Sequence, residues 1–117
     1  RAALSGLRAA PGWADAPRPV ATSELLPERA LAGDHEAAAE LIRLIYTPLA
    51  ADATLLATAS SYLEQTTSLE ATARALFIHP NTVRYRLRRI ADLTGFSPTD
   101  NRGNFTIRVG LTLGRLL

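Results

Sequence analysis

The stretch TSLEATARALFIHPNTVRYRLRRIADLTG, residues 67–95, holds two helical patterns that are joined by a very short connection. Thr67, with Glu70 three positions later, has the spacing of a capping box, in which two side chains satisfy free backbone N–H groups at a helix start. A helix is predicted over residues 68–76. Its inward positions are Leu69, Ala73 and Leu76. The middle one is small, so a crossing helix can approach closely there.

The second pattern covers residues 81–94 and ends at Gly95, because glycine favours the left-handed conformation of a helix C-terminus. Pro80 suits the first helical turn, where its missing N–H group costs nothing. Only residues 77–79 connect the two helices. Two helices joined by so short a turn, the first with a small inward residue, form a helix-turn-helix, which we expect at residues 68–94.

The second helix has two opposed faces. At about 100° per residue, an apolar stripe is formed by Val83, Leu87 and Ile90. The side that lies about 140° away from this stripe holds Asn81, Arg84, Tyr85 and Arg88. Between the faces, or beside the polar one, lie Thr82, Arg86 and Arg89. Like charges four residues apart repel by a few tenths of a kcal/mol, and no nearby acid offsets them here. This arrangement favours a surface that meets a polyanion over an ordinary solvated face.

The charges of the whole chain are divided unevenly. Residues 1–67 hold five arginines against eight acids, a net charge of −3, whereas residues 68–117 hold eight arginines against three acids, a net charge of +5. Such asymmetry between halves indicates a localised contact with nucleic acid or another anion.

The composition excludes several classes of function. The chain has no Cys, so it has no thiol nucleophile and no cysteine zinc site. His35 and His79 lack the supporting ligands of a metal site, and no phosphate-binding glycine loop or nucleophile constellation is present. We therefore expect no enzyme, no metal and no cofactor. No apolar run approaches the roughly 18 residues of a membrane span, and no signal peptide is evident, so we expect a cytoplasmic protein without a membrane partner.

Residues 1–20 mix small residues with proline and glycine, and they are interpreted as a linker or as the tail of an upstream domain. Residues 21–117 are predicted to form one helical domain. The chain contains no Met, including at position 1, and we expect it to be a segment of a longer polypeptide.

Three more helices are predicted between residues 22 and 66, and no alternating strand pattern appears before residue 100. The residues that cap or close them are, in order, Thr22 or Ser23, Gly33, Asp34 and Asp52. The second of these helices is expected to end at the Thr47–Pro48 break. Their apolar positions are Ala38, Leu41, Ile42 and Ile45, and then Leu55, Leu56, Ala59 and Leu63. The fold class is all-α.

The last segment, FTIRVGLTLGRLL (105–117), alternates like a strand but also fits a helix led by Asp100 or Asn101. A lone strand would have no partner in an all-α domain, so a helix is predicted. Gly110 and Gly114 weaken this helix by roughly 1 kcal/mol each, unless close packing uses them.

The stretch SLEATARALFIHPNTVRYRLRRIADLTG (68–95) resembles the C-terminal helix-turn-helix of PucR-type bacterial transcriptional regulators, in which a sequence like NTVRYRLRRI is the hallmark. Its turn and second helix are also similar to the Fis-type DNA-binding domain. The resemblance extends more weakly from about Leu26 to the end, including LLPERALAGD (25–34). It implies a small helical bundle, an upstream sensory domain in the same chain, and a recognition helix at about residues 80–94 in the major groove of double-stranded DNA. A homodimer, through the last helix or the upstream region, is a further hypothesis.

By this resemblance, the positions that reach bases are His79, Pro80, Asn81, Arg84, Tyr85 and Arg88. The positions that lie toward phosphates are Thr82, Arg86 and Arg89. Two of these residues keep a second interpretation: His79 as the N-cap of the second helix, and Tyr85 as a packing residue. Many relatives of the wider class have Gly where this chain has Phe77, and Phe tolerates a positive φ poorly, so the turn is expected to differ from the commonest type. The competing function is a helical protein-interaction module whose basic face docks an acidic partner.

Overall fold

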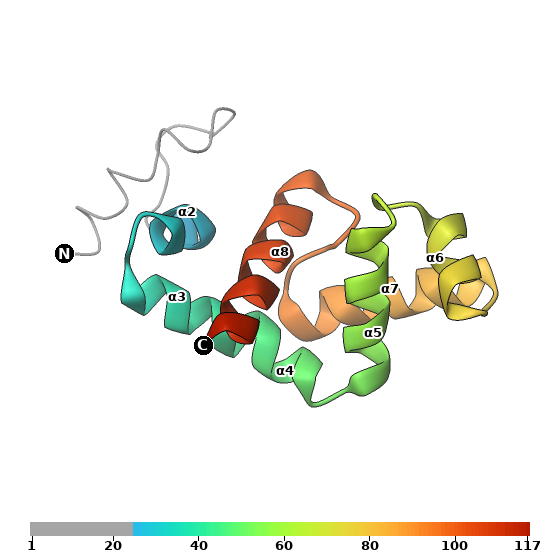
Figure 1. The fold of residues 1–117 in the computed structure, drawn as a ribbon, viewed down its shortest axis with the longest axis horizontal. Coiled ribbons are helices and arrows are strands. Elements are labelled where there is room, and N and C mark those ends of the chain that lie inside the picture. The colour runs from blue at the N-terminus through green and yellow to red at the C-terminus, as the bar shows by residue number, and fades with distance from the viewer. Residues whose placement is uncertain (1–24) are drawn as a thin grey trace.

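The computed structural model describes residues 25–117, and every regular element among them is a helix, which confirms the all-α prediction. The expected linker at residues 1–20 and the expected cap at Thr22 or Ser23 lie outside the described residues. In chain order the helices are α2 (Leu26–Leu31), α3 (His35–Leu41), the π-helical η3 (Ile42–Tyr46), α4 (Thr47–Ala50), α5 (Ala53–Glu64), α6 (Leu69–Leu76), α7 (Pro80–Thr94) and α8 (Asn101–Leu116) (Figure 1).

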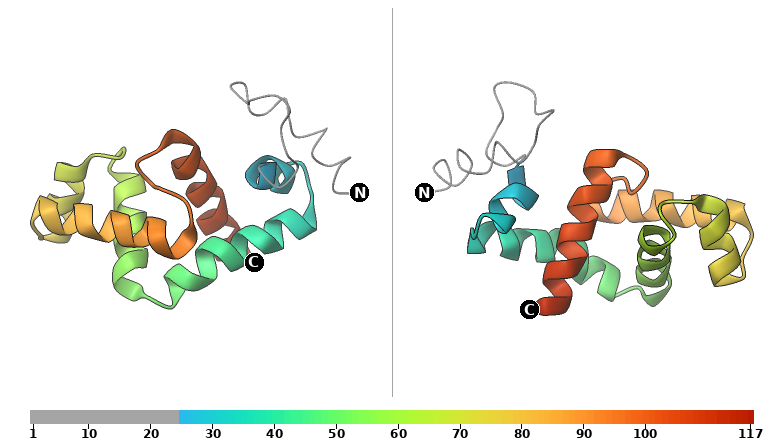
Figure 2. Two further views of the ribbon diagram at one scale, coloured as in Figure 1. Left: turned by 180° about the vertical axis from the view of Figure 1, so that it is seen from behind. Right: turned by 45° about the horizontal axis from the view of Figure 1, so that its top comes forward.

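The helices form two groups that share one core. α5, α6 and α7 pack on one another at one end of the molecule, and α2, α3 and α8 pack together at the other (Figures 1 and 2). α3, η3 and α4 run end to end and connect the groups. The largest buried side chains of the core come from both groups and from this connection: Leu41, Ile45, Leu49, Val83, Leu87, Ile90, Ile107 and Leu111. The helix-turn-helix therefore rests on a core that continues into the rest of the domain.

Side chains cap most of these helices. Hydrogen bonds from first-turn N–H groups are accepted by Asp34, Asp52, Ser68, His79 and Asp100. The caps predicted at Asp34 and Asp52 are confirmed, but the cap predicted at Thr67 is wrong by one residue. The Ser68 hydroxyl accepts from the Ala71 N–H at 3.1 Å, while Thr67 has a φ of 59° and turns its hydroxyl to a backbone carbonyl.

The predicted break at Thr47–Pro48 is also wrong, because the chain stays helical through it. A proline inside an α-helix clashes with the carbonyl four residues earlier and removes one hydrogen bond. The preceding residues widen into the π-helical turn η3, in which the Thr47 N–H donates to the carbonyl of Ile42, five residues back. A wider turn of this kind makes room for a proline. Helical structure consequently runs from His35 to Ala50.

The last segment is a helix, as predicted, and close packing does use its glycines. A Cβ atom on Gly110 would lie 2.8 Å from the Cβ and Cδ1 atoms of Ile45, and one on Gly114 would lie 2.1 Å from Cγ of Tyr46. Both neighbours belong to η3. The two glycines therefore let α8 lie directly against the π-helical turn.

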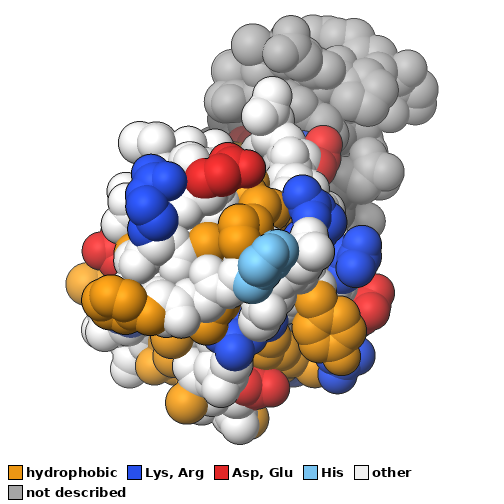
Figure 3. All heavy atoms as spheres, turned by 90° about the vertical axis from the view of Figure 1, so that its right-hand side faces the viewer, with side chains coloured by type: hydrophobic (Ala, Val, Ile, Leu, Met, Phe, Trp, Pro, Cys, Tyr) orange, Lys and Arg blue, Asp and Glu red, His pale blue; other side chains and the backbone are white. Residues whose placement is uncertain are grey.

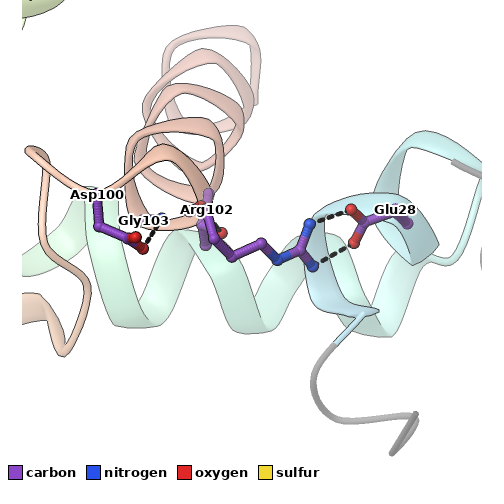
Figure 4. A network of polar contacts seen from close by, with 5 residues as sticks. Glu28, Asp100, Arg102 and Gly103 are labelled. Carbon is purple, nitrogen blue, oxygen red and sulfur yellow. Dashed lines mark hydrogen bonds and ion pairs between the residues drawn. The ribbon is translucent and has the colours of Figure 1, made fainter. Parts of the chain in front are cut away.

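An ion pair joins α2 to the start of α8 (Figure 4). Arg102 Nη2 donates to Glu28 Oε1 at 2.5 Å, and Nη1 pairs with the second carboxylate oxygen. The Glu28 side chain is only 4% exposed. Beside it, the Asp100 carboxylate accepts from the Gly103 N–H at 3.0 Å and fixes the beginning of α8. The paired residues are 74 positions apart, so no local sequence pattern reveals them.

Candidate nucleic-acid interface

The turn between α6 and α7 is closed by a residue in the left-handed conformation. Phe77 has φ 58° and ψ 44°, and the following N–H, of Ile78, donates to the carbonyl of Ala73 at 3.0 Å. This is the geometry that glycine usually supplies at a helix C-terminus. The expectation that Phe77 changes the turn type is therefore wrong, because Phe77 adopts the left-handed conformation that glycine usually adopts there.

His79 caps α7. Its Nδ1 accepts a hydrogen bond from the Asn81 N–H at 2.9 Å, and Pro80 occupies the first turn of the helix as predicted. Because Nδ1 accepts, the neutral imidazole carries its proton on Nε2 in this arrangement. His79 therefore has a structural role, and its second nitrogen is left as a donor on an exposed side chain.

The two predicted faces of α7 are confirmed. Val83 and Ile90 are 0% exposed and Leu87 is 3% exposed, so the apolar stripe holds the helix against the core. The exposed residues of the other side are Asn81, Arg84, Tyr85, Arg88 and Arg89. Tyr85 is 58% exposed, which argues against packing as its main role. The helix ends at Gly95, with φ 83°, as the sequence predicts.

Two of the outward residues contact each other. Arg84 Nη1 donates to Asn81 Oδ1 at 2.6 Å, across one turn of the helix. A guanidinium held in this way loses less conformational entropy when it meets a partner. The first two turns of α7 therefore present an oriented arginine together with the remaining donors of an amide.

Arg86 and Thr82 lie at the sides of α7 and are half-buried. Arg86 points toward α5, where its Nη1 donates to Thr58 Oγ1 at 3.5 Å. This is at the long end of hydrogen-bond distances. The structure thus separates Arg86 from the exposed arginines of α7, a distinction that the sequence pattern did not make.

Two neighbouring residues escaped the sequence-based assignment. Arg74, in the last turn of α6, and Phe77, in the turn, are both exposed, and Phe77 is 94% exposed. They line one shallow open recess together with His79 and Pro80. Figure 3 faces this end of the molecule and shows arginine side chains among exposed hydrophobic and acidic ones. The sequence signal that could have found Phe77 is a large apolar residue at the glycine position of the turn.

Within residues 25–117, no cluster of three or more His, Cys, Asp or Glu side chains is placed to hold a metal ion. No single helix in this part of the chain is long and apolar enough to cross a membrane; only the pair His35–Ala50 and Ala53–Glu64 passes together, and it is bent by 114°.

Comparison with known proteins agrees with this geometry. The family model described as the PucR C-terminal helix-turn-helix domain matches residues 55–113. Uncharacterized proteins of Mycobacterium tuberculosis and Mycobacterium bovis are 52% identical over 115 residues, which is 97% of this chain and 28% of each relative. The purine catabolism regulatory protein of Bacillus subtilis is 39% identical over 66 residues, 56% of this chain and 12% of that protein.

A solved structure also matches the whole arrangement. The crystal structure of a regulator of polyketide synthase expression from Bifidobacterium adolescentis superposes with a TM-score of 0.91 at 44% identity, over 99% of this chain and 49% of that one. The chain therefore spans about a quarter of the mycobacterial relatives, at 28%, and about half of this regulator, at 49%. It belongs to the PucR C-terminal helix-turn-helix family, a family of DNA-binding regulatory domains.

Proposed function

We propose that the domain is the sequence-specific DNA-binding output module of a bacterial transcriptional regulator, with α7 inserted in the major groove of double-stranded DNA. The observation that supports this proposal most directly is the distribution of buried and exposed side chains around α7. Its buried apolar stripe holds the helix on the core, and its opposite side is basic and exposed. A recognition helix needs this combination, because base edges must be read by side chains opposite those that attach the helix to its scaffold.

Base reading is assigned to the outward side and the N-terminal turn of α7. Arg84 and Arg88 are exposed and can form bidentate pairs with guanine, and Asn81 can pair with adenine, each pair being worth roughly 1–3 kcal/mol of discrimination. The Arg84–Asn81 hydrogen bond supports this assignment, because it orients the guanidinium before DNA is met. The residues that complete the proposed base-contact set are His79, Pro80 and Tyr85.

Phosphate contacts are assigned to the flanks of α7. Arg89 is exposed beside the reading face, and Thr82 is half-buried near the N-terminus of the helix. Arg86 can join them only if its guanidinium releases Thr58, and the 3.5 Å length of that bond makes the exchange easy. Contacts of this kind position a protein on the duplex without reading its sequence.

The decisive test is the salt dependence of binding to a labelled duplex of random sequence. A dissociation constant of about 10⁻⁴–10⁻⁶ M is expected near physiological salt, and binding should become tighter as the salt concentration falls. The triple variant Arg84→Ala/Arg88→Ala/Arg89→Ala should flatten the slope of log K against log salt by roughly two to three. On a random duplex the base-reading arginines meet no matching bases and contact phosphates instead, and each phosphate contact contributes about 0.9 to the slope. Arg86 is left in place because it contacts α5.

The matched control removes three arginines that lie outside the helix-turn-helix in the sequence: Arg1, Arg8 and Arg18. This variant has the same net charge as the first one but should keep most of the affinity and slope of the wild type. Equal losses in both variants would indicate attraction by net charge alone. Failure of the wild type to bind any duplex at low salt would favour the competing function, a basic face that docks an acidic protein.

The arrangement of the whole regulator is also a proposal. Because the chain covers 28% of its mycobacterial relatives, we propose that an upstream sensory domain controls this module in the cytoplasm and that the intact protein is a homodimer. Exposed leucines at the end of α8, Leu116 at 75% and Leu117 at 84%, support a subunit contact there. Sedimentation at micromolar concentration tests the proposed homodimer, and finding only monomers of both the chain and the intact protein would contradict it.

A further inference from the structure

Phe77 combines two unfavourable features at one position. Its side chain is 94% exposed, and its backbone lies in the left-handed region at φ 58°. Glycine would avoid the exposure of an aromatic ring, and it adopts positive φ values freely. A bulky residue held in this conformation is a genuine outlier, and such outliers gather at functional sites. The folded domain alone therefore gives no reason for phenylalanine at this position.

The surroundings of Phe77 connect it to the reading end of α7. The recess that it lines also contains His79 and Pro80, which precede and begin the recognition helix. One wall of the recess carries a cation, Arg74, and an anion, Glu70. The aromatic ring is thus the most exposed apolar group at the place where the turn enters α7, next to residues that are assigned to base contact.

We propose that Phe77 is a specificity residue that packs its ring against the C5-methyl group of a thymine at the edge of the major groove. This inference rests on the proposed function of α7 and adds a contact that the basic face does not supply. The thymine methyl is the apolar group of the major groove, and Phe is among the side chains that recognise it. A phenyl ring has no hydrogen bond to offer a phosphate, so a base methyl is the DNA group that its chemistry fits.

The first experiment selects bound duplexes from a random library with the complete chain, and then measures the affinity and thermal stability of Phe77→Gly on the selected duplex. Glycine relieves the positive φ, so the melting temperature should rise, by about 4 °C for each kcal/mol of strain relieved. The affinity for the selected duplex should nevertheless fall several-fold. A structural role alone predicts the same rise in melting temperature with unchanged DNA binding.

The second experiment locates the contact on the DNA. Each thymine of the selected duplex is replaced in turn by deoxyuridine, which lacks only the C5-methyl group. At one position the wild type should lose about fourfold in affinity, the value of one buried methyl group. Phe77→Gly should not respond to the same replacement, and this loss of coupling identifies the ring as the partner of the methyl group.

Leu31→Ala is the control for loss of an exposed apolar side chain, because Leu31 is 65% exposed on α2 at the other end of the molecule. It should leave DNA affinity unchanged. If Phe77→Gly binds the selected duplex as well as the wild type, or if no deoxyuridine position distinguishes the two proteins, the methyl contact is wrong, and the ring becomes a candidate for protein docking. If the wild type selects no sequence, the proposed function itself fails.

Discussion

Arg88 and Arg89 are adjacent in sequence but point about 100° apart around α7. Both are exposed, so burial does not distinguish them. Their difference comes from phase: Arg88 shares the outward direction of Arg84 and Asn81, whereas Arg89 lies beside it. This distinction could be predicted from the sequence, because once the buried side of a helix is known, the spacing of 100° per residue gives the direction of every other side chain. The contact of Arg86 with Thr58 could not be predicted from the sequence, because it depends on where α5 packs.

Arg88→Ala is predicted to relax sequence preference, whereas Arg89→Ala weakens binding to all duplexes about equally. A lost bidentate pair with guanine costs roughly 1–3 kcal/mol at one base position, but a lost phosphate contact carries no sequence information. Competition between a selected duplex and a scrambled one measures the difference. Equal losses on both duplexes for both variants would contradict this division of roles.

Tyr62 provides a prediction about pH. It is buried in α5, and burial raises the pKa of its hydroxyl above the ordinary value of 10.0, although a hydrogen bond with Thr67 acts in the opposite direction. The folded state therefore holds this proton more tightly than the unfolded state does. The corresponding stability is fully present below the unfolded pKa of about 10 and is lost as the pH rises through the folded pKa.

Tyr62→Phe should consequently lose less stability than the wild type as the pH rises from about 9 to about 12, with the difference developing above about pH 10. Thermal unfolding followed by circular dichroism across that range is the measurement. Tyr85→Phe is the matched control, since Tyr85 is 58% exposed, and it should keep the alkaline sensitivity of the wild type. Identical pH profiles for wild type and Tyr62→Phe would show that another group controls the alkaline loss.

At the scale of elements, local patterns predicted α6 and α7, because periodicity and end signals act within a few residues. The local pattern of α8 also fits a strand, and its helical form was predicted from the all-α context instead. The predictions were wrong where the local structure depends on packing against distant parts of the chain. The π-helical turn before Pro48 packs against α8 and the core, and these contacts cannot be seen in the local sequence. Phe77 keeps a positive φ because the packing of α6 on α7 outweighs a preference of roughly 1–2 kcal/mol.

Gly110→Ala tests the contact between α8 and η3. Alanine favours helix by up to about 1 kcal/mol over glycine, but its Cβ would lie 2.8 Å from two atoms of Ile45, which is 0% exposed and cannot move aside. Overpacking of this kind costs about 1–3 kcal/mol, so we expect net destabilisation. Thr112→Ala, on the exposed side of the same helix, should be nearly neutral. Urea unfolding measures the free energy of unfolding of both variants, and a Gly110→Ala variant more stable than the wild type would contradict the close contact between α8 and η3.

At the scale of the whole molecule, α8 ties the two helix groups together. Its first turn holds α2 through the Arg102–Glu28 ion pair, and its later turns reach α5, where Arg108 donates to the Leu63 carbonyl at 3.1 Å and Arg115 donates to Ser60 at 2.6 Å. These contacts join segments that are far apart in the sequence, which is why periodicity could not predict them. α2 therefore connects to the scaffold of α7 through α8.

Glu28→Gln is predicted to destabilise the domain by about 2 kcal/mol, less than the roughly 3–5 kcal/mol for breaking a fully buried pair, because the Arg102 side chain is 25% exposed and water can solvate it. DNA affinity should be unchanged under conditions in which the variant is folded, since α2 lies at the opposite end of the molecule from the N-terminus of α7, where most of the base contacts are proposed (Figure 1). A double-mutant cycle with Arg102→Met isolates the pair, and the double variant should lose less than the sum of the single variants. Strict additivity, or a loss under about 0.5 kcal/mol for Glu28→Gln, would mean that apolar packing alone holds α2 on α8.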